Sequence, residues 1–233
     1  MSKTFIVPDG TKFINRGMVP KDVTECIIPD TVSEIGNMAF DECKKLTTVV
    51  IPSTVSEIGH MAFWGCEKLT DVVIPNGVTS IGACAFACCT SLKSVEIPTS
   101  VKSLGKGVFS ECSNLSTIII PNGVEKINNF AFSNCTSLKS VEIPTSVKSI
   151  GMYSFLNCIN LSAIIIPNGV EEIGDSAFDG CSSINGVITI PDSVKYAGSC
   201  AFRGCKNVEE IIIPSHLSEY VYTAFPRCIT KIK

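Results

Sequence analysis

Apolar residues follow one another along this chain in an order that repeats every 23 residues. Written out, one unit reads LxxVxIPxxVxxIGxxAFxxCxx, with mostly polar residues at the x positions. A unit of this size cannot bury its own apolar side chains, so equivalent residues must stack into columns of a shared core. The clearest column is a phenylalanine that always stands three residues before a cysteine, at Phe40, Phe63, Phe86, Phe109, Phe132, Phe155, Phe178, Phe202 and Phe225.

The interval between units is nearly constant. Ile-Pro pairs place prolines 23 residues apart from Pro29 to Pro167, and Pro191 then follows after 24 residues. Pairs of units are more alike still, because residues 90–105 and 136–151 differ at one position of sixteen. The chain is therefore a repeat array that contains a duplicated 46-residue block.

Each unit contains one short strand and several turn signals. The LxxVxI part alternates inward and outward positions, is rich in β-branched residues, and ends at a proline that cannot donate to a sheet ladder. Asn-Gly or Thr-Ser pairs then favour a turn, and the glycine of VxxIG is expected to allow a further bend. The AFxxC part predicts a helical or 3₁₀ turn opposite the strand.

Together these signals predict a β-rich α/β solenoid, a right-handed superhelix of about nine 23-residue turns. One face is expected to carry a parallel β-sheet, and short helical turns are expected on the other. Residues 1–22 hold a degenerate unit that lacks AFxxC, and we interpret them as an N-terminal capping repeat. Residues 23–233 then form one continuous solenoid domain. No cap is recognisable after Cys228, so truncation or a dimer contact is expected to shield the last turn.

The unit LxxVxIPxxVxxIGxxAFxxCxxL resembles the BspA-type leucine-rich repeat and is similar to the leucine-rich repeats of Treponema pallidum. The resemblance covers residues 23–228 and rests on eight to ten fixed positions in each of nine turns. It implies a leucine-rich-repeat fold, a role in adhesion or in binding a host or extracellular-matrix protein, and no catalytic residues or cofactor.

Composition narrows the function classes further. The longest aliphatic runs, such as 118–120, are far shorter than the roughly 18 to 20 residues that span a bilayer. The net charge is -3 and the basic residues are scattered, so nucleic acid is not expected as a partner. The first residues lack the apolar region of a secretory signal, which favours an intracellular protein or an excised piece of a longer one. The family resemblance also allows the cell surface, so the location stays open.

Thirteen cysteines require an interpretation of their own. We predict a reduced and buried cysteine ladder, because equivalent side chains in a stack point the same way and free cysteine is a common small core residue. A second possibility is a metal site at Cys84, Cys88 and Cys89 with His60, which the lack of four convergent ligands disfavours. Cys84 and Cys88 also leave open a redox-responsive thiol protein. The ladder consists of Cys43, Cys66, Cys89, Cys112, Cys135, Cys158, Cys181, Cys205 and Cys228.

The residue pattern gives little support to the hypothesis that the chain is an enzyme. The two histidines, His60 and His216, lie nearly seven turns apart and cannot share a catalytic site. The carboxylates between the valine and isoleucine positions fit a solvated face. The chain is therefore predicted to be non-catalytic and to hold no metal.

One outward-facing column of the predicted sheet is mostly apolar, and we predict that it forms the partner-binding surface. Strand propensity alone would also place valine and isoleucine there. The hypothesis is a non-catalytic scaffold that binds a protein through this column. The alternative is a structural protein that associates with itself into a homodimer or filament. The column comprises Ile27, Val50, Val73, Glu96, Ile119, Glu142, Ile165, Thr189 and Ile212.

Overall fold

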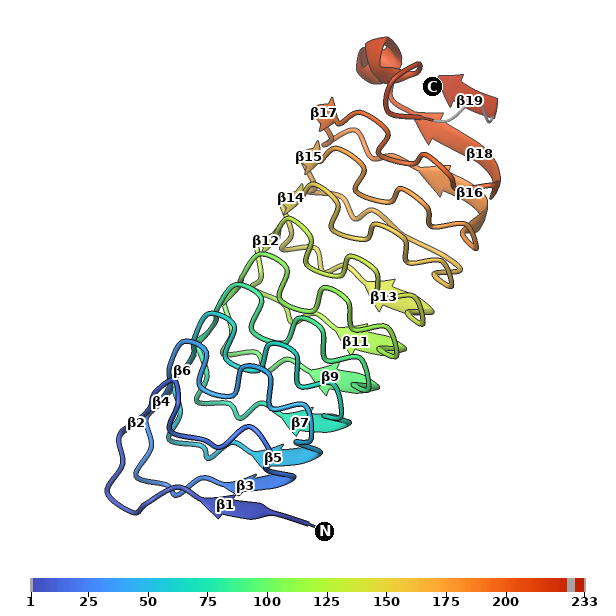
Figure 1. The fold of residues 1–233 in the computed structure, drawn as a ribbon. Coiled ribbons are helices and arrows are strands. Elements are labelled where there is room, and N and C mark those ends of the chain that lie inside the picture. Colours follow the sequence, from blue (N-terminus) through green and yellow to red (C-terminus); the bar gives the residue numbers. More distant parts are fainter. Residues whose placement is uncertain (1, 226–228, 233) are drawn as a thin grey trace.

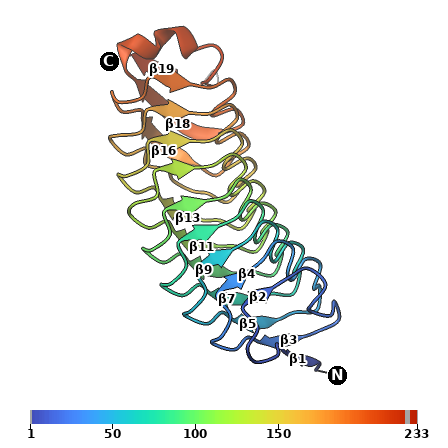
Figure 2. The ribbon, with the colours of Figure 1, turned by 90° about the vertical axis from the view of Figure 1, so that its left-hand side faces the viewer.

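The protein is a gently curved column of stacked coils (Figures 1 and 2). The computed structural model describes residues 2–225 and 229–232. It confirms a solenoid of parallel strands. There are about ten coils, one more than predicted, because residues 1–22 add strands to both rows of the stack. Whether these residues act as a cap stays a prediction.

The first row of strands is formed by the LxxVxI part of each unit. Its seven-stranded sheet is parallel and in register, so Thr117 lies between Ser94 and Ser140. The strands are β1 (Thr4–Ile6), β3 (Glu25–Ile27), β5 (Thr48–Val50), β7 (Asp71–Val73), β9 (Ser94–Glu96), β11 (Thr117–Ile119) and β13 (Ser140–Glu142). Near the C-terminus β16 (Asn185–Thr189), β18 (Asn207–Ile213) and β19 (Ile229–Ile232) form a separate three-stranded sheet.

A second row of parallel strands, which the sequence pattern did not predict, is formed where VxxIG re-enters the core. Its strands are two residues long and form a five-stranded and a four-stranded sheet. The first contains β2 (Phe13–Ile14), β4 (Glu34–Ile35), β6 (Glu57–Ile58), β8 (Ser80–Ile81) and β10 (Ser103–Leu104). The second contains β12 (Lys126–Ile127), β14 (Ser149–Ile150), β15 (Glu172–Ile173) and β17 (Tyr196–Ala197).

The AFxxC segments form single turns closed by i→i−3 backbone bonds, such as the one from Cys89 to Phe86 at 3.3 Å, and they contain no regular helix. The only helix in the described part of the chain is the 3₁₀ helix η1 (Ser215–Tyr220). In the AFxxC segments two residues per coil are left-handed, for example Cys84 and Cys88 with φ of 54° and 60°. This conformation turns every second N–H toward the next coil, so Cys84, Phe86 and Cys88 donate to backbone carbonyls there at 2.8–2.9 Å. Bonds between coils thus alternate with turn bonds within the coil, such as the one from the Ala87 N–H to the Cys84 carbonyl at 3.1 Å.

The phenylalanine column forms the centre of the core. From Phe40 to Phe202 the rings are fully buried, and neighbouring rings stack with centroids 4.7–5.9 Å apart. Phe225 continues the stack at 5.8 Å from Phe202. Such offset stacks add to the stabilisation from buried area. The column prediction is confirmed for all nine phenylalanines.

The glycine of VxxIG serves close approach of the coils, and not the bend expected from the sequence. A Cβ on Gly59 would lie 2.7 Å from the backbone nitrogen of Asn37 in the preceding coil. From Gly36 to Gly198, Asn128 is the exception in this column, and the second row is interrupted between β10 and β12 at that coil. There the Asn128 side-chain amide donates to the Leu104 carbonyl at 2.7 Å. In the coil before, the Gly105 backbone N–H makes the equivalent bond to Ile81 at 2.8 Å.

We expect Asn128→Ala to lower the free energy of unfolding by about 1–3 kcal/mol, because it removes the donor to Leu104 and keeps a Cβ between the coils. Asn128→Gly should lower it less, since the backbone N–H can then reach Leu104. Urea denaturation of both variants tests this. A glycine variant less stable than the alanine variant would contradict the close-approach role of the column.

Ser154 occupies a column otherwise filled by alanine and valine. Its side chain is fully buried, and its hydroxyl has no hydrogen-bond partner among the residues that the structure describes. We expect Ser154→Ala to raise the free energy of unfolding by about 1–2 kcal/mol, because it removes a buried, unpaired polar group. The matched change Ala131→Ser, one coil earlier, should lower it by a similar amount. Equal stabilities by urea denaturation in all three proteins would show that the hydroxyl is satisfied.

Candidate protein-binding face

The first row of strands exposes the predicted apolar column, which we call the ridge: Ile27, Val50, Val73, Glu96, Ile119, Glu142, Ile165, Thr189 and Ile212. In each of these strands the middle residue is directed into the core and its two neighbours outward, as period-two alternation requires. Val73, Ile119 and Ile165 are 74%, 65% and 80% exposed. The outward orientation of the ridge is thus confirmed, with Ile212 half-buried at its end. Partner binding there stays a prediction.

Two further exposed apolar residues belong to this face. Ile6 pairs in register with Ile27 and extends the ridge by one strand. In the sequence, Val7-Pro8 is equivalent to Ile28-Pro29, which makes Ile6 equivalent to Ile27. Ile6 could therefore have been predicted as part of the ridge. Val187 is 52% exposed and pairs with Glu210. Val187 lies in a 24-residue unit, so an alignment of the units at a fixed 23-residue interval does not place it on this face.

Acidic side chains interrupt and flank the apolar residues. Asp71, Glu96 and Glu142 are exposed on the face, and none has an ion-pair partner among the described residues. Hollows of about 270 and 380 Å³ lie between the ridge and the row of prolines beside it. The face therefore offers apolar contact area, shallow relief and negative charge.

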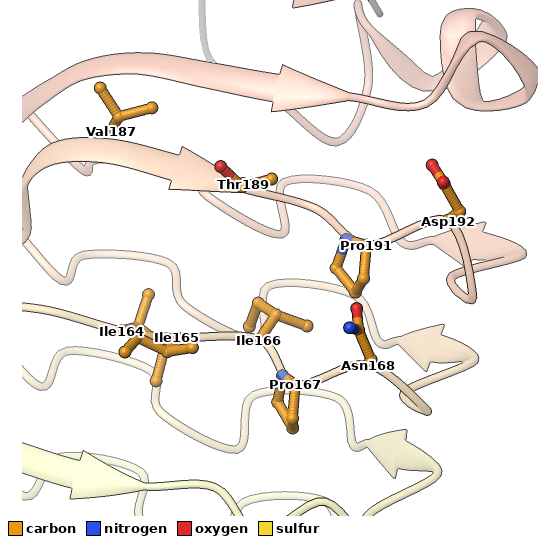
Figure 3. A pocket seen from close by; sticks show the side chains of 9 residues that line it. All are labelled: Ile164, Ile165, Ile166, Pro167, Asn168, Val187, Thr189, Pro191 and Asp192. Atoms are coloured by element: carbon orange, nitrogen blue, oxygen red, sulfur yellow. The ribbon is translucent and has the colours of Figure 1, made fainter.

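The sheet is interrupted at residues 163–166, between β13 and β16. These residues alternate between buried and exposed as the strands do, yet they pair with neither neighbouring strand. A hollow of about 470 Å³ lies on the β13 side, and one of about 460 Å³ lies on the β16 side. Figure 3 shows the second hollow, with Ile164–Ile166 on one wall and Val187 and Thr189 on the other. We call this region the opening.

The cysteine ladder lies inside the stack, away from the ridge. Its members from Cys43 to Cys181 are free and buried, Cys205 is buried, and Cys228 lies outside the described residues. Each thiol from Cys66 to Cys205 donates to a phenylalanine carbonyl of the preceding coil at 3.1–3.3 Å. The ladder therefore joins neighbouring coils through protonated thiols.

The remaining cysteines and the histidines do not converge. Cys84 and Cys88 are half-buried, and burial raises the pKa of both thiols. One ring nitrogen of His60 and one of His216 each lie 2.8 Å from a backbone carbonyl oxygen, in well-separated coils. Among the described residues no three His, Cys, Asp or Glu side chains are grouped to hold a metal ion.

The stacked parallel strands and the repeating LxxVxIP unit define a leucine-rich-repeat solenoid. The model of the BspA type leucine-rich repeat region matches residues 20–139 and 125–233. The chain belongs to this family.

Solved structures agree with that assignment. A leucine-rich repeat protein from Bacteroides ovatus is 27% identical with a TM-score of 0.80, over 99% of this chain and 66% of its own. The Treponema pallidum leucine-rich repeat protein is 28% identical with a TM-score of 0.65, over 95% of this chain and 91% of its own. The pneumococcal vaccine antigen PcpA, at 18% identity over 93% of this chain and 73% of its own, shares the fold with a TM-score of 0.54.

This chain thus spans just under two thirds of the Bacteroides protein. A comparison with curated protein sequences gives no match. In the described residues, no helix has both the length and the apolar character needed to cross a membrane.

The buried thiols predict a loss of stability at alkaline pH. Desolvation raises the pKa of Cys26 to about 12 and that of Cys43 to about 11 in the folded state. An unfolded thiol ionises near pH 8.5, so below that pH both states are protonated and stability is complete. Between that pH and the folded pKa, each buried thiol lowers the free energy of unfolding by about 1.4 kcal/mol per pH unit.

We therefore expect the free energy of unfolding, measured in urea under reducing conditions, to fall from about pH 9 upward. Cys112→Ser keeps a donor to the Phe86 carbonyl and removes one titrating thiol. Its slope should be shallower by about 1.4 kcal/mol per pH unit. An unchanged slope would show that Cys112 ionises freely in the folded protein.

Proposed function

We propose that this protein is a non-catalytic scaffold that binds a protein partner through the ridge. The observation that carries the proposal is a line of exposed β-branched side chains along the strand face, including Val50, Val73, Ile119 and Ile165, which Glu96 and Glu142 interrupt. Exposed apolar strips of this kind are typical of interaction surfaces. Family membership supports a repeat scaffold, and a host or extracellular-matrix protein is the partner that we propose on the basis of the family.

Charge on the face specifies the chemistry of that partner. Asp71, Glu96 and Glu142 lie among the apolar residues without ion pairs in the described chain. A partner with apolar side chains flanked by lysine or arginine would complement them and associate faster at low salt. A second copy of the chain would bring glutamates toward glutamates and is disfavoured on the same ground.

The thiol-based alternative has weaker support. A reactive cysteine needs a lowered pKa in a positively charged, accessible environment. Burial instead raises the pKa of Cys84 and Cys88, and the nearby Glu111 raises that of Cys88 further. The raised pKa values of these two thiols therefore favour a protein-binding scaffold over a redox-responsive thiol protein.

The test replaces Val73, Ile119 and Ile165 together with threonine. The fold should persist, because threonine keeps the β-branch and none of these side chains enters the core. Affinity for a partner captured with the wild-type chain and then purified should fall by about 100-fold, as for a loss of a few kcal/mol at an interface centre. A matched control changes Ile159 and Tyr222, exposed apolar residues off the ridge, to threonine and should bind normally.

Binding should also weaken as salt is raised, because the exposed carboxylates contribute less when screened. Sedimentation of the wild type and the triple variant measures self-association in parallel. A folded triple variant with unchanged affinity would mean that the ridge reflects strand propensity alone. A concentration-dependent dimer that the triple variant abolishes would assign the ridge to a second copy of this chain.

A further inference from the structure

The opening lies next to a departure from the repeat in the sequence. Pro191 lies ten residues after Cys181, whereas Pro167 lies nine after Cys158. The register of β16 against β18 shifts between Gly186 and Val187, where Gly186 has a φ of +73°. A glycine in this conformation is typical of a β-bulge, which bends its strand and disrupts pairing locally. In this pairing Gly186 and Val187 lie opposite Val208 and Glu210, so Glu209 of β18 is skipped, and the long unit directly follows residues 163–166.

The backbone of residues 163–166 is left without strand partners. In the regular coils a strand such as β11 pairs with both neighbours. No N–H or C=O group of 163–166 makes a backbone hydrogen bond to any other residue that the structure describes. Backbone polar groups require partners, so solvent or a ligand must satisfy these.

Hydrogen bonds between coils are present before and after residues 163–166. Before them, the Ser162 N–H donates to Lys139 at 3.1 Å, and the Ser162 carbonyl accepts from Asn185 at 3.2 Å. After them, the Glu171 N–H donates to Lys148 at 2.7 Å. In the core behind them, the Phe155 and Phe178 rings remain stacked at 5.2 Å. The coils therefore separate only at the sheet face.

The surroundings combine apolar and acidic groups. Ile165 is 80% exposed and Val187 is 52% exposed on the outer surface. Glu142 lines the hollow on the β13 side, and Asp192 lines the hollow on the β16 side. Figure 3 shows Asp192 beyond Pro191, at the end of the hollow away from Val187. An extended stretch of unpaired backbone thus lies between two carboxylates.

We propose that the opening binds an extended segment of a protein partner, whose backbone pairs with residues 163–166. Such strand addition takes affinity from backbone hydrogen bonds and specificity from alternate side chains. About 13 Å of strand is available, enough for roughly four residues of the segment. Apolar side chains at every second position contact Ile165 and Val187, and lysine or arginine pairs with Glu142 and Asp192. This inference deepens the proposed function and rests on it.

The experiment uses the full chain and a labelled seven-residue peptide that alternates lysine and valine. A second peptide carries N-methyl groups on every second amide, which removes donors and keeps the side chains. We expect the first peptide to bind and the methylated one to bind about tenfold or more weakly. Equal binding of the two would overturn backbone pairing, and so would failure of the first to bind at millimolar concentration.

Hydrogen exchange on the wild-type chain gives a second readout that needs no variant. The amides of residues 163–166 should exchange rapidly in the free protein, while those of β11 exchange slowly. The alternating peptide should slow exchange at 163–166. Amides that are already slow without peptide would show a continuous sheet and overturn the proposal.

Deletion of Gly186 restores the 23-residue unit. We expect residues 163–166 to pair with β16 in this variant, their amides to become protected without peptide, and peptide affinity to fall by about tenfold or more. Tyr222→Thr, a change at an exposed residue off the ridge, is the control and should leave peptide binding unchanged.

The outcomes separate this inference from the proposed function. A folded deletion variant that still binds the purified ridge partner with wild-type affinity, and binds the peptide unchanged, would overturn the opening as a binding site and leave the ridge intact. A concentration-dependent dimer that protects residues 163–166 without peptide would replace the foreign segment with a second copy and overturn the partner assignment.

Discussion

The structure depends on one constraint, the close approach of each coil's backbone to the next. The parallel ladders, the left-handed residues of AFxxC and the glycine column all meet this constraint, because each brings an N–H within reach of a carbonyl one coil away. Once that distance is fixed, residues 23 positions apart must stack directly. The phenylalanine rings and the buried thiols follow as columns of identical contacts.

Most of this architecture could be predicted from the sequence, because equivalence along the stack is visible as periodicity. Columns such as Phe132 and its neighbours were assigned correctly, as was the outward orientation of Ile119. The conformation of AFxxC could not be predicted. Local preferences disfavour left-handed backbone for residues such as Phe130 and Tyr153, and bonds between coils override them. The second row of strands was not predicted either, because a strand of two residues is too short to show the alternation of buried and exposed positions that indicates a strand.

Both interruptions of the strand rows occur where the sequence departs from its own repeat. Asn128 stands in the glycine column, and the extra residue near Gly186 lengthens one unit. Either departure can be noticed in the sequence. The effect of each departure on strand pairing cannot be predicted from the sequence. It depends on whether the neighbouring coil moves, forms a bulge, or uses a side chain to restore the lost hydrogen bond. The opening is therefore visible only in the three-dimensional arrangement, although a single additional residue marks the unit beside it.

The near-identity of residues 90–105 and 136–151 has a consequence for how such a protein changes over generations. Coils built on the same contacts are interchangeable, so unequal recombination between the two copies would remove or add a block of 46 residues and keep the core columns in register. Each such event alters the distance between the N-terminal part of the ridge and the opening by two coil spacings, about 10 Å. The length of the array can therefore change in steps of two coils. Each step changes the spacing between the two proposed binding regions and keeps the repeated type of contact between coils.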